Sequence, residues 1–306
     1  MEYLFVLAGL VFLYFGGEWL VRGAIGVSRK LGLPAFLISL TVVGFGTSMP
    51  ELLVSLKAAV GGYPGIVLGN VVGSNIANIL LIVGLAAVIA PIKVSKGMSR
   101  RDAIVMVISA IALVAALSFQ TITLLAGGAM LLALFAYLAL AYMQDRKEGC
   151  SESDQITFPL STSRVVILLA VGLVMLVAGA DLLVRGATTI ASDLGVSNAV
   201  IGLTVVAVGT SLPELATSVV AALHRRSDIA IGNVIGSNIF NILGILGITS
   251  LVCPVPVAER FFLIDGWVML GATLLLFGLL LFCRQIGRLA GSGFLLAYAA
   301  YVVSMT

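Results

Sequence analysis

Long apolar stretches follow one another along almost the whole chain, separated by short connections. They fall near residues 3–27, 35–60, 64–90, 103–119, 121–143, 165–191, 198–223, 229–252, 261–282 and 289–304. Most are close to the roughly 20 residues that a helix needs to span a bilayer. Only one polar stretch, Gln144–Ser163, interrupts them at length, and it has the composition of a linker. The pattern predicts an all-α polytopic membrane protein with ten transmembrane helices.

The sequences on the two sides of this linker repeat each other at an offset of 163 residues. The block TVVGFGTSMPELLVS, which starts at Thr41, matches TVVAVGTSLPELATS, which starts at Thr204, at 10 of 15 positions. A second block, GNVVGSNIANIL from Gly69, matches GNVIGSNIFNIL from Gly232 at 10 of 12 positions. Each half holds five spans, an odd number, so the second half enters the membrane from the opposite face. We therefore expect two inverted five-helix repeats, residues 1–143 and 164–306, joined by the linker 144–163.

Basic residues are distributed unevenly between the two sides of the membrane. Thirteen lysines and arginines fall in connections on the side of the linker, whereas Arg260 alone falls on the other side. Connections rich in lysine and arginine stay in the cytoplasm. We therefore expect a cytoplasmic linker and both termini outside, in a multi-pass protein of the plasma or inner membrane.

The composition excludes several classes of protein. The chain is 60% hydrophobic and 10% charged, whereas soluble domains carry about 25% charged residues. The one histidine, His224, lies in a predicted loop, which excludes an HExxH site and a serine–histidine pair within the membrane. No nucleotide-binding glycine loop precedes a lysine, which argues against ATP-driven pumping. We expect no enzyme, no cofactor and no nucleic-acid partner, and the sequence leaves the oligomeric state open.

Each of the repeated blocks places a glutamate inside an apolar span. Such a carboxylate is costly in a membrane and marks a functional site by default. Pro50 and Pro213 cannot donate a backbone hydrogen bond, so each of these helices should break there and free carbonyls near Thr47 and Thr210. Together with these carbonyls, Glu51 and Glu214 would provide six oxygens, the lower bound of what calcium prefers. A kinked structural helix is the alternative interpretation, and the duplication argues against it.

The third span of each half adds neutral oxygen donors. Ser74 and Asn78 are four residues apart and share a helix face, as do their repeat mates Ser237 and Asn241. Hydroxyl and amide oxygens suit sodium or calcium, and no soft sulfur or imidazole suits zinc or copper. The candidate ion-binding set is completed by two serines of the GTS motifs, Ser48 and Ser211.

Other polar residues within the spans have structural interpretations. We expect two asparagines to hold helices together, two i, i+4 pairs to form structural ion pairs or interfacial anchors, and two aspartates at span ends to be solvated. In that order, these are Asn75 and Asn238, then Glu18–Arg22 and Asp181–Arg185, then Asp102 and Asp265.

Over essentially its whole length, the chain resembles the calcium/cation antiporter superfamily, and most closely the prokaryotic sodium/calcium exchangers. The resemblance rests on the paired blocks GTSMPE with GNVVGSNIAN and GTSLPE with GNVIGSNIFN. It implies ten helices in two inverted halves, and a cluster of four sites at the midplane for one calcium or several sodium ions. It also implies calcium ligands at both glutamates and both threonine carbonyls. Sodium ligands would add the serines and asparagines of the third spans, and the backbone near Gly44 and Ala207.

One position departs from the pattern that the resemblance implies. Exchangers of this type usually have aspartate where this chain has Asn241. The site then carries at most two negative charges, which match one calcium but leave three sodium ions with a net charge of +1. We expect a secondary antiporter that exchanges calcium for sodium by alternating access. The alternatives are calcium/proton or sodium/proton exchange on the same scaffold, and a passive cation channel.

Overall fold

The computed structural model describes residues 2–94, 100–148, 161–194 and 209–305. Almost all of these residues are helical, and the helices before the linker lie close to the predicted spans. They are α1 (Glu2–Leu31), α2 (Ala35–Ile38), the π-helix η1 (Ser39–Val43), α3 (Gly44–Thr47), α4 (Met49–Val60), α5 (Pro64–Ala77), the π-helix η2 (Asn78–Val83), α6 (Gly84–Ile89), α7 (Arg100–Leu117) and α8 (Leu124–Glu148).

The helices after the linker follow the same plan. They are α9 (Thr162–Asp193), α12 (Leu212–Leu223), α13 (Ser227–Ile239), the π-helix η5 (Phe240–Leu246), α14 (Gly247–Val252), the π-helix η6 (Phe261–Asp265), α15 (Gly266–Phe282) and α16 (Arg288–Val303). The predicted span 198–223 is described only from residue 209 onward, so the expected backbone site at Ala207 lies outside the described residues.

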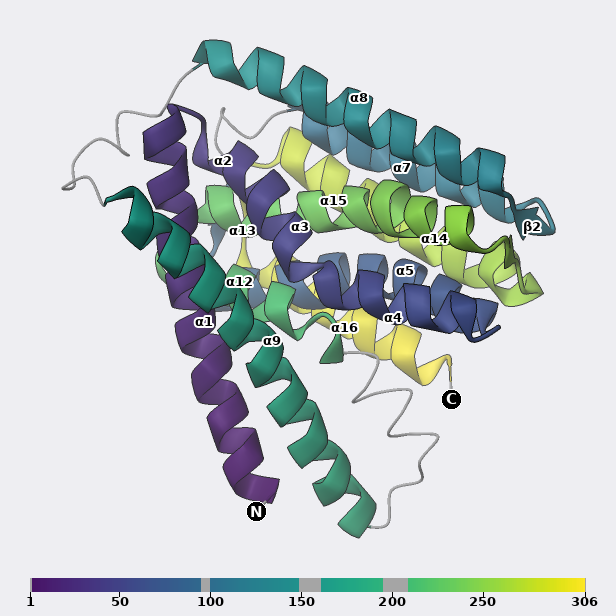
Figure 1. The fold of residues 1–306 in the computed structure, drawn as a ribbon, viewed down its shortest axis with the longest axis horizontal. Coiled ribbons are helices and arrows are strands. Elements are labelled where there is room, and N and C mark those ends of the chain that lie inside the picture. The colour runs from purple at the N-terminus through teal and green to yellow at the C-terminus, as the bar shows by residue number, and fades with distance from the viewer. Residues whose placement is uncertain (1, 95–99, 149–160, 195–208, 306) are drawn as a thin grey trace.

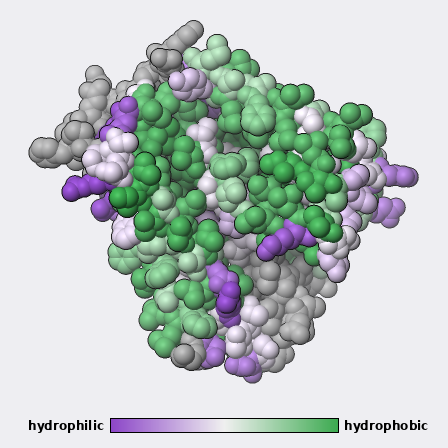
Figure 2. Space-filling model, viewed as in Figure 1, coloured by the Kyte–Doolittle hydropathy of each residue, from purple (hydrophilic) through white to green (hydrophobic). Residues whose placement is uncertain are grey.

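The described helices are those of a membrane protein. Six of them are long and apolar enough to cross a bilayer, and the bent pair Ala35–Thr47 with Met49–Val60 makes seven. Figure 2 shows apolar side chains over much of the viewed face. Exposed leucine, valine, isoleucine and phenylalanine side chains are numerous on α1, α8 and α9, as expected of helices that face lipid. The prediction of a polytopic α-helical protein is thus confirmed.

The predicted break in the second span lies at Ser48, between α3 and α4. The two segments are bent by 42° relative to each other. Pro50 stands in the first turn of α4, where its missing N–H costs nothing. Pro213 stands at the same place in α12, after Ser211. Each half-helix therefore begins next to the glutamate that it carries.

Two short strand pairs connect segments from before and after the linker. β1 (Ile92–Lys93) pairs with β4 (Gln285–Ile286), and β2 (Thr121–Ile122) pairs with β3 (Val255–Pro256), both antiparallel. Since β1 and β3 begin at repeat-related positions, the two pairs are equivalent under the repeat. The predicted fifth span accordingly starts as a strand, and helix α8 follows only at residue 124.

Helices α1 and α9 pack against each other more extensively than any other pair, and Figure 1 shows them side by side, extending away from the other helices. Glycines seven residues apart allow this contact. A Cβ added at Gly9 would lie 2.8 Å from the carbonyl oxygen of Gly179, and one at Gly16 would lie 2.9 Å from that of Gly172. The earlier glycine of α1 therefore lies against the later glycine of α9, and the later against the earlier. The two helices are thus antiparallel, with their backbones in direct contact.

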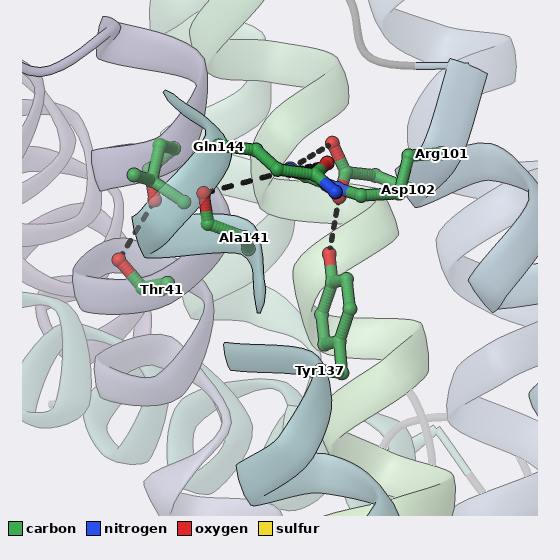
Figure 3. A network of polar contacts seen from close by, with 7 residues as sticks. Thr41, Arg101, Asp102, Tyr137, Ala141 and Gln144 are labelled. Atoms are coloured by element: carbon green, nitrogen blue, oxygen red, sulfur yellow. Dashed lines mark hydrogen bonds and ion pairs between the residues drawn. The ribbon is translucent and has the colours of Figure 1, made fainter. Parts of the chain in front are cut away.

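Asp102 corrects one of the sequence-based expectations, because it is fully buried instead of solvated. It lies in the first turn of α7 and faces α8. Arg101 donates to its carboxylate at 2.8 Å, and the Tyr137 hydroxyl donates at 2.8 Å. Figure 3 shows this network, in which Arg101 also donates to Gln144 at 3.1 Å. A charge removed from water needs such partners, so the aspartate fastens α7 to α8.

The repeat mate Asp265 requires the same correction, since its side chain is also buried. Arg260 donates to it at 3.2 Å and Tyr301 of α16 donates at 3.2 Å. The two buried aspartates therefore fasten equivalent helix pairs, although their arginine and tyrosine partners are not at repeat-related positions. Because the partners do not align between the two halves, the sequence repeat did not indicate which residues would bond these aspartates.

The predicted ion pairs are confirmed. Arg22 lies 2.6 Å from the buried Glu18, which also contacts His224 at the end of α12. The pair Asp181–Arg185, 2.9 Å apart, is exposed on α9. Glu18 is therefore a charge-compensated carboxylate that joins α1 to α12.

Candidate functional site

Two hydrogen bonds join the start of α4 to the start of α12, and so link the second spans of the two halves. Ser48 Oγ donates to Glu214 Oε1 at 2.8 Å, and Ser211 Oγ donates to Glu51 Oε1 at 3.3 Å. Each glutamate is 1% exposed. The bonds are exact repeat mates, so the two breaks face each other and bring the two carboxylates into one buried site.

Buried side-chain atoms without a hydrogen-bond partner gather in this set of residues. The described part of the chain has eight such atoms, and only Arg29 Nε and Thr249 Oγ1 belong to residues outside the predicted ion-binding set. The other six are Glu51 Oε2, Glu214 Oε2, Thr210 Oγ1, Asn78 Oδ1, and both Oδ1 and Nδ2 of Asn241. An unpartnered buried polar atom costs about 1–3 kcal/mol, and more when it is charged. Five unpartnered oxygens in the predicted set are therefore free to bind a cation.

The third spans border the same site. Ser211 Oγ also lies 3.3 Å from Ser74 Oγ, and Ser237 Oγ donates to the Gly44 carbonyl at 3.4 Å. The Asn78 amide donates to Asn238 Oδ1 at 3.1 Å, which leaves its own oxygen unpartnered. These five polar side chains are each at most 5% exposed. The structure thus brings the predicted serines of both third spans to the broken second spans, whereas Asn241 is buried with neither of its side-chain polar atoms hydrogen-bonded.

The asparagines expected to hold helices together differ from each other. Asn238 bonds Asn78 and also donates to the Met106 sulfur at 3.8 Å, so it does link helices. Asn75 instead donates to the Val71 carbonyl of its own helix at 2.7 Å. An i−4 bond of this kind satisfies a buried amide without a neighbouring helix.

The two threonines are also placed unequally. Thr47 is fully buried, and its hydroxyl bonds the Val43 carbonyl at 3.1 Å and Asn233 Oδ1 at 3.3 Å. Its mate Thr210 is partly buried, and its hydroxyl has no partner. Both lie directly before a break, where carbonyl groups can face a site instead of the helix ladder.

Two further asparagines contact the site, and sequence reasoning missed them. Asn70 Nδ2 donates to the Glu51 carbonyl at 2.9 Å and to Ser55 Oγ at 2.8 Å. Asn233 Nδ2 donates to the Glu214 carbonyl at 3.3 Å and to Ser218 Oγ at 3.0 Å. Both asparagines and both serines fall within the repeated blocks, so the repeat itself was the available signal.

The chemistry of this donor set is specific. All of the donors are oxygens, and two of them are carboxylates. No group of three histidine, cysteine, aspartate or glutamate side chains that could hold a metal ion occurs in the described ranges. Oxygen-only coordination with two negative charges suits hard cations such as calcium and sodium and disfavours zinc or copper.

Comparisons with known proteins identify the family of the chain. A family model described as sodium/calcium exchanger protein matches residues 1–143 and 164–306. The putative antiporter CaxA of Alkalimonas amylolytica is 37% identical over 97% of this chain and 96% of its own length. The sodium/calcium exchanger MaX1 of Methanosarcina acetivorans is 34% identical over 99% and 98%.

Solved structures give the same answer for the fold. The sodium-calcium exchanger NCX_Mj, soaked with 10 mM Na⁺ and 10 mM Sr²⁺, superposes with a TM-score of 0.86. It is 35% identical in sequence, and the match covers 100% of this chain and 98% of that one. The chain is therefore similar to exchangers in sequence and in the arrangement of its helices over its whole length, and it belongs to the sodium/calcium exchanger family.

Proposed function

We propose that this protein is a secondary antiporter that exchanges calcium for sodium across the membrane by alternating access. The observation that carries the proposal is the pair of crossed serine–glutamate bonds, because it assembles two buried carboxylates whose second oxygens have no partner. Such a site would be costly in a purely structural protein. A passive channel needs weak and continuous binding along a pore, whereas an enclosed site favours a carrier.

Calcium is bound in this proposal by Glu51, Glu214 and the carbonyls of Thr47 and Thr210. Sodium ions use the same carboxylates together with hydroxyl and amide oxygens of both halves. Those oxygens come from Ser48, Ser74, Asn78, Ser211, Ser237 and Asn241. Because the two ions share the carboxylates, calcium and sodium cannot be bound together at full occupancy, which is the condition for exchange.

Asn241 sets the charge of the site. Two carboxylates balance one calcium ion, whereas three sodium ions would leave an excess of one positive charge in a region of low dielectric. We therefore propose that fewer than three sodium ions are exchanged for each calcium. Protons compete for the same carboxylates, and a proton gradient is for that reason a separate arm of the test below.

The transmembrane arrangement that we propose has ten helices in two inverted repeats of five, residues 1–143 and 164–306. The linker 144–163 is cytoplasmic and both termini lie outside the plasma or inner membrane. The two equivalent strand pairs and the repeat-related buried aspartates support this symmetry. The interlocked pair of α1 and α9 is suited to move as one unit beside the helices that carry the site.

Calcium uptake into proteoliposomes tests the function. Vesicles loaded with sodium, potassium or a low-pH buffer are diluted into calcium solutions in which that cation or proton gradient is directed outward. Uptake that requires the sodium gradient and saturates with calcium supports exchange. Uptake that follows the proton gradient alone supports the calcium/proton alternative, and uptake without any gradient of a counter-ion would refute an antiporter.

A further inference from the structure

Asn70 holds the first turn of the half-helix that carries Glu51. Its amide nitrogen bonds the main-chain carbonyl of that glutamate at 2.9 Å and the hydroxyl of Ser55, one turn later, at 2.8 Å. A primary amide nitrogen has two hydrogens, so one side chain makes both bonds at once. A main-chain carbonyl can only accept, which fixes the nitrogen of this amide toward α4.

Asn233 does the same for Glu214 in the other half. It reaches the Glu214 carbonyl at 3.3 Å and Ser218 Oγ at 3.0 Å, and its side chain is fully buried. Its oxygen additionally accepts from Thr47 Oγ1 at 3.3 Å. This asparagine therefore joins the ligand helix of the second half to the break in the first half.

These contacts matter because both ligand helices begin at a break. The first turn of a helix has no preceding turn to hold it through backbone bonds, so tertiary contacts decide where its side chains point. On each half-helix, one of the asparagine's two bonds is made to the main-chain carbonyl of the ligand residue itself, and the other to a serine one turn later. A displacement of that carbonyl moves the carboxylate by a similar distance.

We propose that Asn70 and Asn233 are positioning residues that hold the two calcium-binding carboxylates at the spacing needed for the ion. The inference rests on the proposed exchange function, since it assigns their role to the same site. Neither asparagine needs to touch the ion. Each acts through the main chain of a ligand, and Asn233 also keeps the two halves of the site in register through Thr47.

The test compares Asn70→Ala, Asn70→Leu and Asn233→Leu with wild type. Leucine keeps approximately the shape of asparagine and removes both donors. The matched control is Asn75→Ala, because Asn75 lies on the same helix as Asn70, is a buried asparagine like Asn233, and donates its bond to the Val71 carbonyl of its own helix. The readouts are the calcium dependence of sodium-driven uptake, the preference for calcium over strontium, and thermal stabilisation of the purified protein by calcium.

We expect the calcium concentration for half-maximal uptake to rise about tenfold in the Asn70 and Asn233 variants, the effect of one or two lost hydrogen bonds. The maximal rate should stay close to wild type, and the preference for calcium over strontium should shrink because a loosened pair of carboxylates discriminates ion size less. The control should retain the calcium dependence of wild type.

In the uptake assay, either of two results would overturn the positioning role. One is that the asparagine variants lose thermal stability but keep the calcium dependence and ion preference of wild type, as expected for residues that serve only in packing. The other is an equal shift in Asn75→Ala.

Calcium-induced thermal stabilisation needs no ion gradient, so this measurement separates the positioning role from the proposed exchange function. If wild type is stabilised by calcium but does not exchange it for sodium, only the proposed function fails. If Asn70→Leu is stabilised as strongly as wild type, the positioning role fails.

Discussion

Replacing Glu51 or Glu214 with glutamine should weaken calcium binding by roughly 30-fold or more. The change keeps the size of the side chain and the oxygen that accepts from Ser211 or Ser48, and removes one of the two negative charges of the site. Two unit charges 4 Å apart interact by about 4 kcal/mol at an effective dielectric constant near 20, and a doubly charged ion gains about twice that. Even if a quarter of the gain survives competition with hydration, about 2 kcal/mol, binding weakens by roughly 30-fold.

The assay is the rise in melting temperature of the purified protein with calcium concentration, followed by sodium-driven calcium uptake. Expression should be maintained, because a buried amide costs less than a buried carboxylate. Glu18→Gln is the matched control, since Glu18 is also buried but its charge is compensated by Arg22. Glutamine variants at the site that bind and transport calcium at wild-type concentrations would refute the assignment of these carboxylates.

Three further predictions concern coupling, packing and topology. Asn241→Asp should increase the dependence of calcium uptake on the sodium gradient, because it adds a third charge for sodium; superimposable curves at two pH values would show that position 241 does not set coupling. Gly16→Leu should destabilise the protein by about 1–3 kcal/mol through overpacking against the Gly172 carbonyl. Gly128→Leu should not, since a Cβ there meets no described atom within 4 Å, and equal melting temperatures would contradict the close contact of α1 and α9. Single cysteines placed in the linker 144–163 of a cysteine-free variant should resist an impermeant thiol reagent in intact cells, and ready labelling would reverse the proposed orientation.

Much of the architecture is predictable from the sequence, because the features that define it are local or repeated. The apolar spans follow from hydropathy, and the break at Ser48 follows from Pro50 two residues later. The ion-binding candidates stand out because polar residues in a membrane helix are rare and these recur at a fixed offset. Local chemistry together with the repeat was sufficient to locate the break at Ser48 and to select the ion-binding candidates.

Other features depend on contacts between distant segments. The buried Asp102 is bonded by Tyr137, which lies on the next helix. The residues around Asp102, at the end of a span, therefore did not indicate that its side chain is buried. The π-helices begin at residues such as Asn78 and Phe240, which are ordinary helix residues by propensity. Asn70 was within the repeated block, but its role became visible only when its partners on α4 were known.

Uphill accumulation of calcium driven by an outward sodium gradient tests the central claim most directly. Proteoliposomes containing wild type, Glu51→Gln or Glu214→Gln are loaded with sodium and calcium and diluted into sodium-free medium containing labelled calcium at the internal concentration. The account predicts that wild type concentrates calcium above the outside level until the sodium gradient has decayed, and that neither variant does. The account would be contradicted if calcium only equilibrated across vesicles that contain wild type, or accumulated equally in vesicles that contain the glutamine variants.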